Sequence, residues 1–567
     1  MLRRPATDAL AASMTDFPSR PATSAPASTA DARHGSPHAA RNFYLALAGA
    51  CLLIGALSLV VLPSTPSYDP WSWLLWAREI IHGHLTITTG GTSWKPLPMI
   101  FTIPLALFGN AAPDLWLVVA RAGALAAVVM VFRLSFRLTR QVGGPPGEPG
   151  QELGRLTAIA PALLAGVLAA VVLTLSASGA FVSSNTLGYS EGFAAALLLI
   201  CIERHLDGRP RQAFLVGFFV ALDRPEIWLF WGPYGLWLFW RDPGARVMVA
   251  VAFILIPICW FLPVYAGCGS FTCSVSRASH PRSNSYAYAS NPFLAELEKG
   301  AWPTMLLRIK VVAALVVIVV AGLLWRTRRR MGLVGLLTAE NRARLTAALL
   351  ALGGLAWFVV IAIMTQAGFS GNNRYLVLGS AMVDICGAVG LGWAARELAG
   401  VAARRLSARR GAGSAATTGG LQWAATGLAA LVFLFGPNWI GSNLISIPRT
   451  HGSLVYQARL RQGMNAIIAR FGGAKRVLAC GSVMTEGFQV PMVSWALGVA
   501  TTRIEAPPAT PAPESAAEAP NVILQTRDTR SAHLLPLLRT WPTVAYHYVG
   551  TSGHVRMFTH HCSGRAT

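Results

Sequence analysis

The sequence predicts an all-α polytopic membrane protein with a small α/β domain at its carboxy terminus. Hydrophobic residues make up 53% of the 567 residues, and charged residues only 13%. Soluble domains carry roughly 25% charged residues. Long apolar stretches recur as far as residue 441, and arginine-rich loops separate them. These observations exclude an ordinary soluble protein.

The formal net charge is +23, which in a soluble protein would suggest nucleic-acid binding. Most of the excess is arginine in short loops between apolar stretches, which is the positive-inside pattern of membrane proteins. We therefore expect no nucleic-acid partner. Residues 1–41 are rich in Ala, Ser, Pro and Arg and lack the apolar surface needed to fold, so they are predicted to form a disordered cytoplasmic tail.

A membrane-spanning helix needs roughly 20 apolar residues. The segment 212–241 has basic residues at both ends and is predicted to be a short hairpin. Counting that hairpin, the scheme gives about 11 transmembrane helices within residues 42–441, with the amino terminus inside and 442–567 outside. The other predicted spans are 43–62, 113–136, 157–177, 190–203, 245–266, 305–325, 345–365, 375–395 and 421–441.

The apex of the hairpin reads Asp223-Arg224-Pro225-Glu226. The first arm, 212–222, would be about 16 Å long at roughly 1.5 Å per residue, which is half a bilayer. Charges at that depth normally face a polar cavity and serve function. The other interpretation is a longer, tilted hairpin whose charges reach the outer interface.

Two external loops are predicted between the spans. The first, 63–112, contains candidate interfacial helices, one of which has Trp71 on its apolar face, where tryptophan suits headgroup depth. Its stretch 97–109 is too short to span a membrane. The second loop, 267–304, is polar.

The tail, 442–567, is predicted to be a small extracytoplasmic α/β domain with a helix at 454–471. Residues 505–520 form a flexible low-complexity insertion, rich in Ala and Pro. Five apolar runs are predicted as strands, at 476–479, 490–495, 521–525, 544–548 and 554–558.

Four cysteines fall on the predicted external side. An even number in an oxidising compartment suits disulfides, and the expected pairs are Cys268 with Cys273 and Cys480 with Cys562. Four free thiols are the alternative.

Asp69 follows the first span by seven residues, in Tyr68-Asp69-Pro70-Trp71, and Lys95 follows in Trp94-Lys95-Pro96-Leu97-Pro98. An acid at the lip of a membrane bundle with a lysine close behind it suits a base acting beside an anionic lipid. Asp69 has a second interpretation as a helix N-cap, and Lys95 as a side chain that snorkels to lipid headgroups.

These motifs resemble the GT-C class of membrane glycosyltransferases, especially the branch of protein O-mannosyltransferases and the lipid A aminoarabinose transferase. The resemblance covers roughly residues 43–395. Pro70 stands where relatives often have a second acid, so a metal-binding acid pair is not supported and no cofactor is assigned. The matching elements, in family order, are Asp69, Ala77-Arg78-Glu79, Lys95-Pro96-Leu97-Pro98, Tyr189-Ser190-Glu191-Gly192, Asp223-Arg224-Pro225-Glu226 and Arg374-Tyr375-Leu376.

The resemblance implies a GT-C-like fold and an enzyme of the plasma membrane. It would move a hexose or pentose, with inversion, from a polyprenyl-phosphate donor to an extracytoplasmic glycan, lipid or protein. Asp69 would be the general base, and Glu191 would hold substrate hydroxyls or position Asp69. The residues expected to bind donor phosphate or substrate are Lys95, Arg224, Glu226, Arg374, Tyr68 and Trp94.

Purely structural roles stay open for some of the other charged residues. Glu191 also suits a helix start, and Arg224 and Glu226 also suit a pair that binds no substrate. At the level of function, the alternatives are a flippase or transporter of lipid-linked saccharides and a non-catalytic envelope assembly protein. Transporters often contain internal repeats, and none is apparent here.

Overall fold

The computed structural model describes residues 37–562, except 88–91, 143–158, 177–179, 280, 282–284, 333, 411–414, 435–443, 508–518, 528 and 537–545. The chain divides into two units, Met1–Ala46 and Leu47–Thr567. Most of the predicted tail 1–41 and of the predicted insertion 505–520 therefore lies outside the described residues. The features discussed below belong to the second unit.

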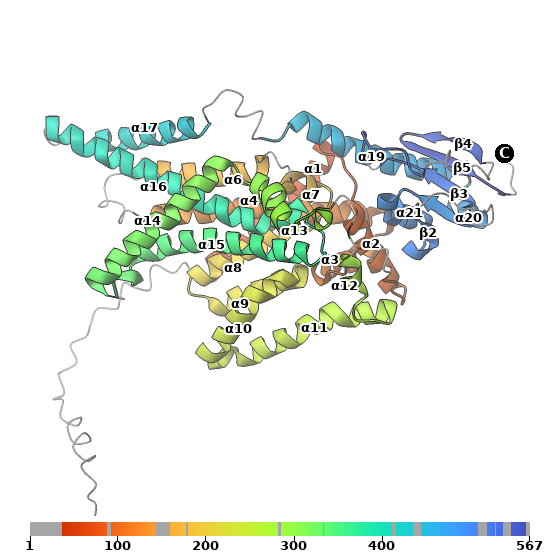
Figure 1. Cartoon of the computed structure of the whole chain (residues 1–567), viewed down its shortest axis with the longest axis horizontal. Coiled ribbons are helices and arrows are strands. Elements are labelled where there is room, and N and C mark those ends of the chain that lie inside the picture. The colour runs from red at the N-terminus through yellow and green to blue at the C-terminus, as the bar shows by residue number, and fades with distance from the viewer. Residues whose placement is uncertain are drawn as a thin grey trace, which may run out of the picture. The chain divides into compact units, whose positions relative to one another are not determined.

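Helices dominate the structure (Figure 1). In the described ranges, six helices are long and apolar enough to cross a membrane, or seven if the bent pair α7–α8 is one span. The predicted class, a multi-pass helical membrane protein with a small α/β domain, is confirmed, while the count of 11 spans stays a prediction. The helices of this part are α1 (Pro37–Val61), α4 (Ala112–Gln141), α6 (Ala160–Leu175), α7 (Ala180–Thr186), α8 (Glu191–Leu206), α11 (Arg246–Cys268), α14 (Leu307–Met331), α15 (Ala339–Gln366), α16 (Val377–Arg410) and α17 (Ala415–Leu434).

Helix α16 is the centre of the bundle, and it packs against α4, α6, α14 and α15. Glycines allow this close approach. A Cβ at Gly387 would lie 2.7 Å from the Ile309 carbonyl oxygen of α14, and one at Gly392 would lie 2.7 Å from the Pro161 carbonyl oxygen of α6. Small residues are a usual means of packing membrane helices closely. The start of α16 is thereby held at a fixed place in the bundle.

The segment predicted as a hairpin consists of α9 (Pro210–Asp223), the 3₁₀ turn η3 (Pro225–Ile227) and α10 (Trp228–Arg241). The two arms pack through a stacked pair, Phe214 and Trp231, whose ring centroids are 4.6 Å apart. Arg211 Nε lies 2.6 Å from a carboxylate oxygen of Asp242, which joins the start of one arm to the end of the other. This packing fixes the charged residues between the arms.

The two segments that were predicted as external loops are largely helical. The first contains α2 (Tyr68–Ile81) and α3 (Pro96–Ala106). Trp71, Trp73 and Trp76 of α2 are all buried, so these side chains contact protein, unlike the expected interfacial tryptophans at headgroup depth. The second loop contains α12 (Cys273–Ala278), η5 (Tyr286–Tyr288), α13 (Pro292–Ala295), the π-helix η6 (Glu296–Ala301) and η7 (Trp302–Thr304).

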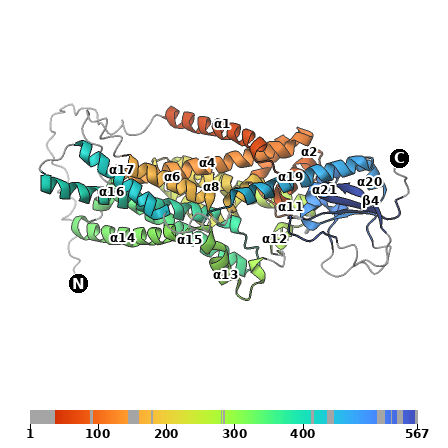
Figure 2. The same ribbon diagram turned by 90° about the horizontal axis from the view of Figure 1, so that it is seen from above.

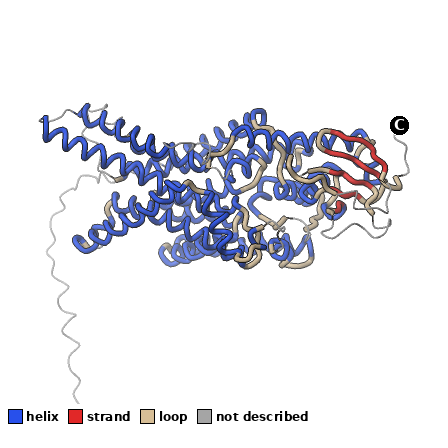
Figure 3. Tube along the Cα trace, turned by 45° about the horizontal axis from the view of Figure 1, so that its top comes forward, coloured by secondary structure: helices blue, strands red, loops and turns tan. Residues whose placement is uncertain are grey.

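The strands lie in the carboxy-terminal domain, where Figure 3 draws them in red. Among the described residues they form a five-stranded sheet in the order β2-β1-β3-β5-β4. Strand β1 is parallel to β2 and β3, whereas β5 is antiparallel to β3 and β4. The elements are α19 (Ile447–Arg470), α20 (Ala474–Ala479), β1 (Val483–Thr485), α21 (Val490–Leu497), β2 (Ile504–Glu505), β3 (Val522–Gln525), β4 (His547–Ser552) and β5 (Val555–Thr559).

Two predicted strands are helices. Residues 476–479 belong to α20 and residues 490–495 to α21. Short apolar runs do not distinguish a strand from a buried helix. The decisive signals at α21 are Pro491 in its first turn and Gly498, left-handed at φ 72°, as its cap. Proline early and glycine just past the end are the usual marks of a helix.

Candidate active site

Seven charged residues meet at the ends of helices, and we call them the charged cluster. They come from five separate segments of the chain: the start of α2, the residue before α3, the start of α8, the turn between α9 and α10, and the 3₁₀ turn η9 (Asn373–Leu376) before α16. Its members are Asp69, Lys95, Glu191, Asp223, Arg224, Glu226 and Arg374.

Asp69 forms an ion pair with Arg374 across 305 positions of sequence. Arg374 Nη2 donates to Asp69 Oδ2 at 2.7 Å, and both side chains are 13% exposed. Burial raises the pKa of the Asp69 carboxyl, but the charges of Arg374 and Lys95 outweigh it and hold the pKa below its usual value. Asp69 is therefore ionised at neutral pH.

The ion pair leaves Arg374 with a spare donor. Its Nη1 is buried and has no hydrogen-bond partner among the residues described, and its guanidinium carbon lies 3.8 Å from the centre of the Tyr189 ring. A guanidinium presents several N–H groups in a fixed fork. Arg374 can thus hold Asp69 through one nitrogen and bind an anion through the other.

Glu191 is the acid on which the three cations converge. Arg224 Nη2 donates to Glu191 Oε1, while Lys95 Nζ and Arg374 Nε lie 3.9 and 3.7 Å from the same oxygen. The Glu191 side chain is fully buried. A carboxylate shared in this way orients cations, because its charge is already engaged. The geometry therefore fits a positioning role for Glu191 better than that of a second base.

Asp223 joins the cluster from the end of α9, and the sequence prediction of the site omitted it. Its side chain is fully buried, with Oδ1 3.9 Å from Lys95 Nζ and Oδ2 3.7 Å from Arg224 Nε. Glu226 Oε1 lies 3.9 Å from Arg224 Nη1. These three distances exceed hydrogen-bond length. The turn between α9 and α10 thus lies beside Lys95 and Glu191. Its two acids, Asp223 and Glu226, lie near the cations of the cluster without short ion pairs to them.

Lys95 and Arg224 each have further partners. Lys95 Nζ donates to Ser190 Oγ at 3.3 Å and lies 5.5 Å from the Trp73 ring. The Arg224 guanidinium lies 4.3 Å from the Tyr375 ring. Aromatic faces stabilise cations without neutralising them. The rings therefore help to fix the direction of both cations, and Arg224 is held by Glu191 as well.

Two of the predicted substrate-binding residues have structural partners. Trp94 is 3% exposed, and its ring nitrogen donates to the Cys259 carbonyl at 3.0 Å. Because Trp94 directly precedes Lys95, this anchor fixes the backbone that carries the lysine. The Tyr68 ring packs edge-on against Phe488, 5.7 Å between centroids.

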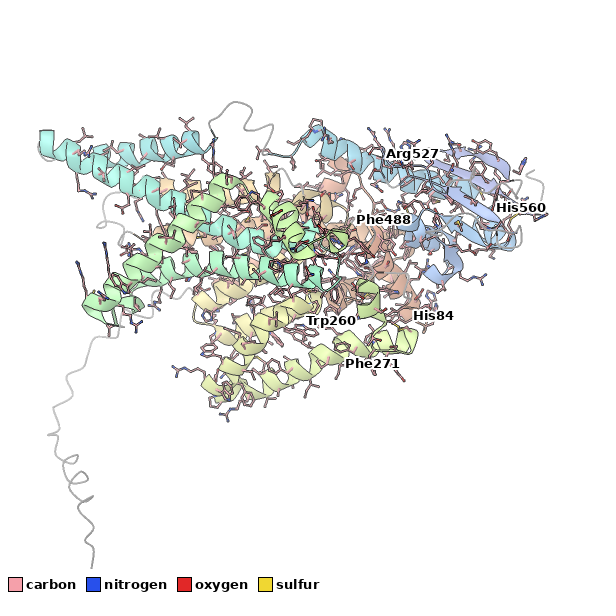
Figure 4. The ribbon with its side chains drawn as sticks, viewed as in Figure 1. His84, Trp260, Phe271, Phe488, Arg527 and His560 are labelled. Carbon is pink, nitrogen blue, oxygen red and sulfur yellow. A yellow bond between two sulfur atoms is a disulfide. The ribbon has the colours of Figure 1, made fainter. Side chains whose placement is uncertain are left out.

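Helix α2 also packs against the carboxy-terminal domain (Figure 2). Arg78 donates to the carbonyls of Trp495 and Val499 at 3.1 and 3.0 Å, and the Trp71 and Trp495 rings are 5.8 Å apart. Phe488, labelled in Figure 4, belongs to the same contact. The domain therefore covers the helix that begins beside Asp69.

The four cysteines that were predicted to lie outside the membrane are bonded in two pairs in the structure. Cys268 at the end of α11 is joined to Cys273, with 6.8 Å between the Cα atoms. Cys480 after α20 is joined to Cys562 after β5, with 4.8 Å between the Cα atoms. The second bond joins the segment that leads into β1 to the segment that follows β5, the two strands on either side of β3. In the part of the chain that is described, no group of three or more His, Cys, Asp or Glu residues converges as metal ligands.

No protein-family model and no curated protein matches the sequence. Among solved structures, the chain is similar to ArnT from Cupriavidus metallidurans in the apo state, with 13% identity and a TM-score of 0.45 over 92% of this chain and 98% of that chain. It is also similar to ArnT from Cupriavidus metallidurans bound to undecaprenyl phosphate, with 13% identity and a TM-score of 0.44 over 91% of this chain and 97% of that chain.

Proposed function

We propose that the protein is a plasma-membrane glycosyltransferase that moves a sugar from a polyprenyl-phosphate donor to an acceptor of the cell envelope. The observation that carries the proposal is the position of Arg374. One of its nitrogens holds Asp69, and another is buried and unpartnered among the described residues. A phosphate oxygen at that second nitrogen would lie beside the base, which is the arrangement that glycosyl transfer from a lipid phosphate requires.

In the proposed reaction, the acceptor hydroxyl attacks C1 of the donor sugar and its proton passes to Asp69. The new bond joins the acceptor oxygen to C1, and the bond from C1 to the phosphate oxygen breaks with both electrons going to the phosphate. Attack from the face opposite the leaving group inverts C1. Polyprenyl phosphate leaves, and its growing charge is stabilised by Arg374, with Lys95 and Arg224 close behind.

The low pKa of Asp69 needs an explanation, because a weakly basic carboxylate is a weak general base. Donor binding supplies one. A phosphate at Arg374 places a negative charge beside the guanidinium, which weakens the hold of Arg374 on Asp69 and raises the proton affinity of the carboxylate. The base would thus be strengthened only when the donor is present.

The test is transfer from a radiolabelled polyprenyl-phosphate sugar by membranes that contain equal amounts of wild type or Asp69→Asn. General-base assistance is worth roughly 10²–10⁴-fold, so the variant should lose at least about a hundredfold in initial rate. Asp242→Asn is the matched control, because it removes an Asp–Arg pair at the base of the hairpin, with Arg211 Nε 2.6 Å away.

Two outcomes would count against the proposal. Transfer by Asp69→Asn at the wild-type rate would contradict the base role. Transfer by neither protein, with several envelope acceptors tried, would favour the flippase or assembly-protein alternatives.

A further inference from the structure

Glu296 is a buried acid outside the charged cluster, at the start of the π-helix η6. It is fully buried, and neither the cluster nor the proposed reaction uses it. The segment that leads to Arg374 packs directly on this carboxyl. A Cβ at Gly371 would overlap Glu296 Oε2, and a Cβ at Gly300 would lie 3.1 Å from Oε1 and 3.3 Å from Leu376. The acid is therefore in contact with the backbone that positions Arg374.

The surroundings of Glu296 suit its neutral form. The Thr365 hydroxyl lies beside the carboxyl, but it donates its own proton to the Ile361 carbonyl at 2.9 Å. The Thr365 oxygen can still accept a hydrogen bond. The Glu296 carboxyl can donate that hydrogen bond only when it is protonated. Burial raises the pKa of Glu296 to about 7, and a hydrogen bond from the Thr365 hydroxyl to the carboxylate would oppose that rise.

Charges near Glu296 do not compensate for its ionisation. Helices α13, α15 and the turns η7 and η9 pack on η6. Turn η9 carries Arg374, already engaged with Asp69, and Tyr375. The charged residues of α15 lie in its first turns, at the far end from Thr365. The other titratable groups of this region are Glu298 and Lys299 on η6, both exposed, and Tyr286 on η5, whose pKa is raised by burial and by Glu296.

We propose that Glu296 is a protonation-controlled positioning residue. Its neutral form holds residues 371–376 where Arg374 reaches Asp69, and its ionised form loosens that segment because the carboxylate must find water or a donor. The catalytic consequence rests on the proposed function, whereas the effect on the Asp69–Arg374 pair does not. Gly371 is essential to this contact, because a larger residue would separate the segment from the carboxyl.

The first test measures the melting temperature Tm of the purified full chain between pH 5 and pH 8. A raised carboxyl pKa gives stability that is full below the unfolded value of 4.5 and is lost as the pH rises to about 7. The Tm of the wild type should therefore fall relative to that of Glu296→Gln over this range and then level off. Glu298→Gln, two residues further along and exposed, is the matched control and should follow the wild type. Parallel curves for wild type and Glu296→Gln would overturn the proposal.

The second test asks whether ionisation of Glu296 weakens the ion pair between Asp69 and Arg374. A double-mutant cycle of Asp69→Asn and Arg374→Gln gives the coupling of the two residues from stability alone. We expect the coupling at pH 8 to be roughly half of its pH 6 value or less in the wild type and unchanged in Glu296→Gln. Equal coupling at both pH values in the wild type would overturn the positioning role. If Glu296→Gln does not fold, Glu296→Leu removes the same titrating group and takes its place.

Transfer activity supplies the third measurement. If only the neutral form is competent, the wild-type rate at pH 8 should be about tenfold below that at pH 6, and Glu296→Gln should lack this loss. An equal fall in transfer rate between pH 6 and pH 8 in both proteins would mean that another group titrates, and it would contradict the proposal. Should the wild type transfer no sugar at all, the proposed function fails, while the Tm and coupling measurements still decide the role of Glu296.

Discussion

The two ends of helix α8 carry two different clusters of charged residues. At its first residue, Glu191 meets Lys95 and Arg374 at distances of 3.9 and 3.7 Å. At its last turns, Glu203 lies 2.5 Å from Arg133, and Asp207 lies 2.6 Å from Arg137 and 2.5 Å from Arg204. At the last turns, both acids have an arginine nitrogen within 2.6 Å. At the first residue, Arg224 pairs closely with Glu191, while Lys95 Nζ and Arg374 Nε lie farther from the same oxygen.

This difference separates a structural role from a proposed functional one. The close pairs join α8 to α4, which supplies Arg133 and Arg137, and α4 and α8 are packed along their length. These pairs hold the two helices together. In the charged cluster, by contrast, Arg374 Nη1 and Glu226 Oε2 lack hydrogen-bond partners among the described residues. Unpaired buried polar groups are costly, and a substrate that pairs with them would recover that cost.

The largest expected effect separates the two ends by activity. Arg374→Gln should lower sugar transfer on the order of 10²–10³-fold, because removing a donor aimed at developing charge costs about that much. Arg137→Gln removes a pair of 2.6 Å at the opposite end and should change the rate less than about twofold. Initial rates normalised to folded protein decide the matter, and equal losses in the two variants would erase the distinction.

The second-largest expected effect concerns stability and distinguishes the two ends of α8. Glu203→Gln leaves the partly exposed Arg133 without its acid, whereas Arg204 keeps Asp207 at 2.5 Å. Breaking a buried pair costs about 3–5 kcal/mol, but because Arg133 is 42% exposed and Arg204 stays paired we expect about 2 kcal/mol. Denaturant unfolding in detergent measures it, with transfer per folded molecule expected to be unchanged. Activity lost without any loss of stability would show that Glu203 serves the reaction.

The smallest expected effect concerns an ion pair that is exposed to solvent. Arg461 of α19 lies 2.6 Å from Asp114 of α4, but the Asp114 side chain is 50% exposed. Exposed pairs contribute about 0.2–1 kcal/mol, so Asp114→Asn should lower the free energy of unfolding by less than about 1 kcal/mol. The effect should shrink further at high salt. A loss as large as that of Glu203→Gln would mean that burial does not govern these pairs.

The sequence predicted the parts of the fold that depend on local pattern. Apolar stretches near 20 residues located the long helices, because the bilayer fixes their length. The short runs 476–479 and 490–495 were wrong as strands, since their environment in the domain, rather than their composition, decides between strand and helix. The buried α2 was also unexpected, because its cover, α21, lies more than 400 positions later.

For the site, the sequence identified members but not partners. Asp69, Lys95, Glu191, Arg224 and Arg374 were all candidates, and the structure brings them together. That Arg374 pairs with Asp69 while Arg224 pairs with Glu191 depends on how five segments meet, which spacing does not encode. Asp223 was named in the hairpin apex but not among the site residues, and the structure places it beside Lys95 and Arg224. Glu296 had no sequence signal, because it lies in a polar loop and only burial distinguishes it from Glu298.

The contact between Arg78 and Trp495 also sets an order of events during synthesis. The two residues are 417 positions apart. At roughly 5–20 residues per second, the ribosome needs roughly 20–80 s to make the chain between them. Throughout that interval, the tryptophans of α2 have been translated while the surface that will enclose Trp71 does not yet exist. The helix that begins beside Asp69 is thus made well before the part of the domain that covers it.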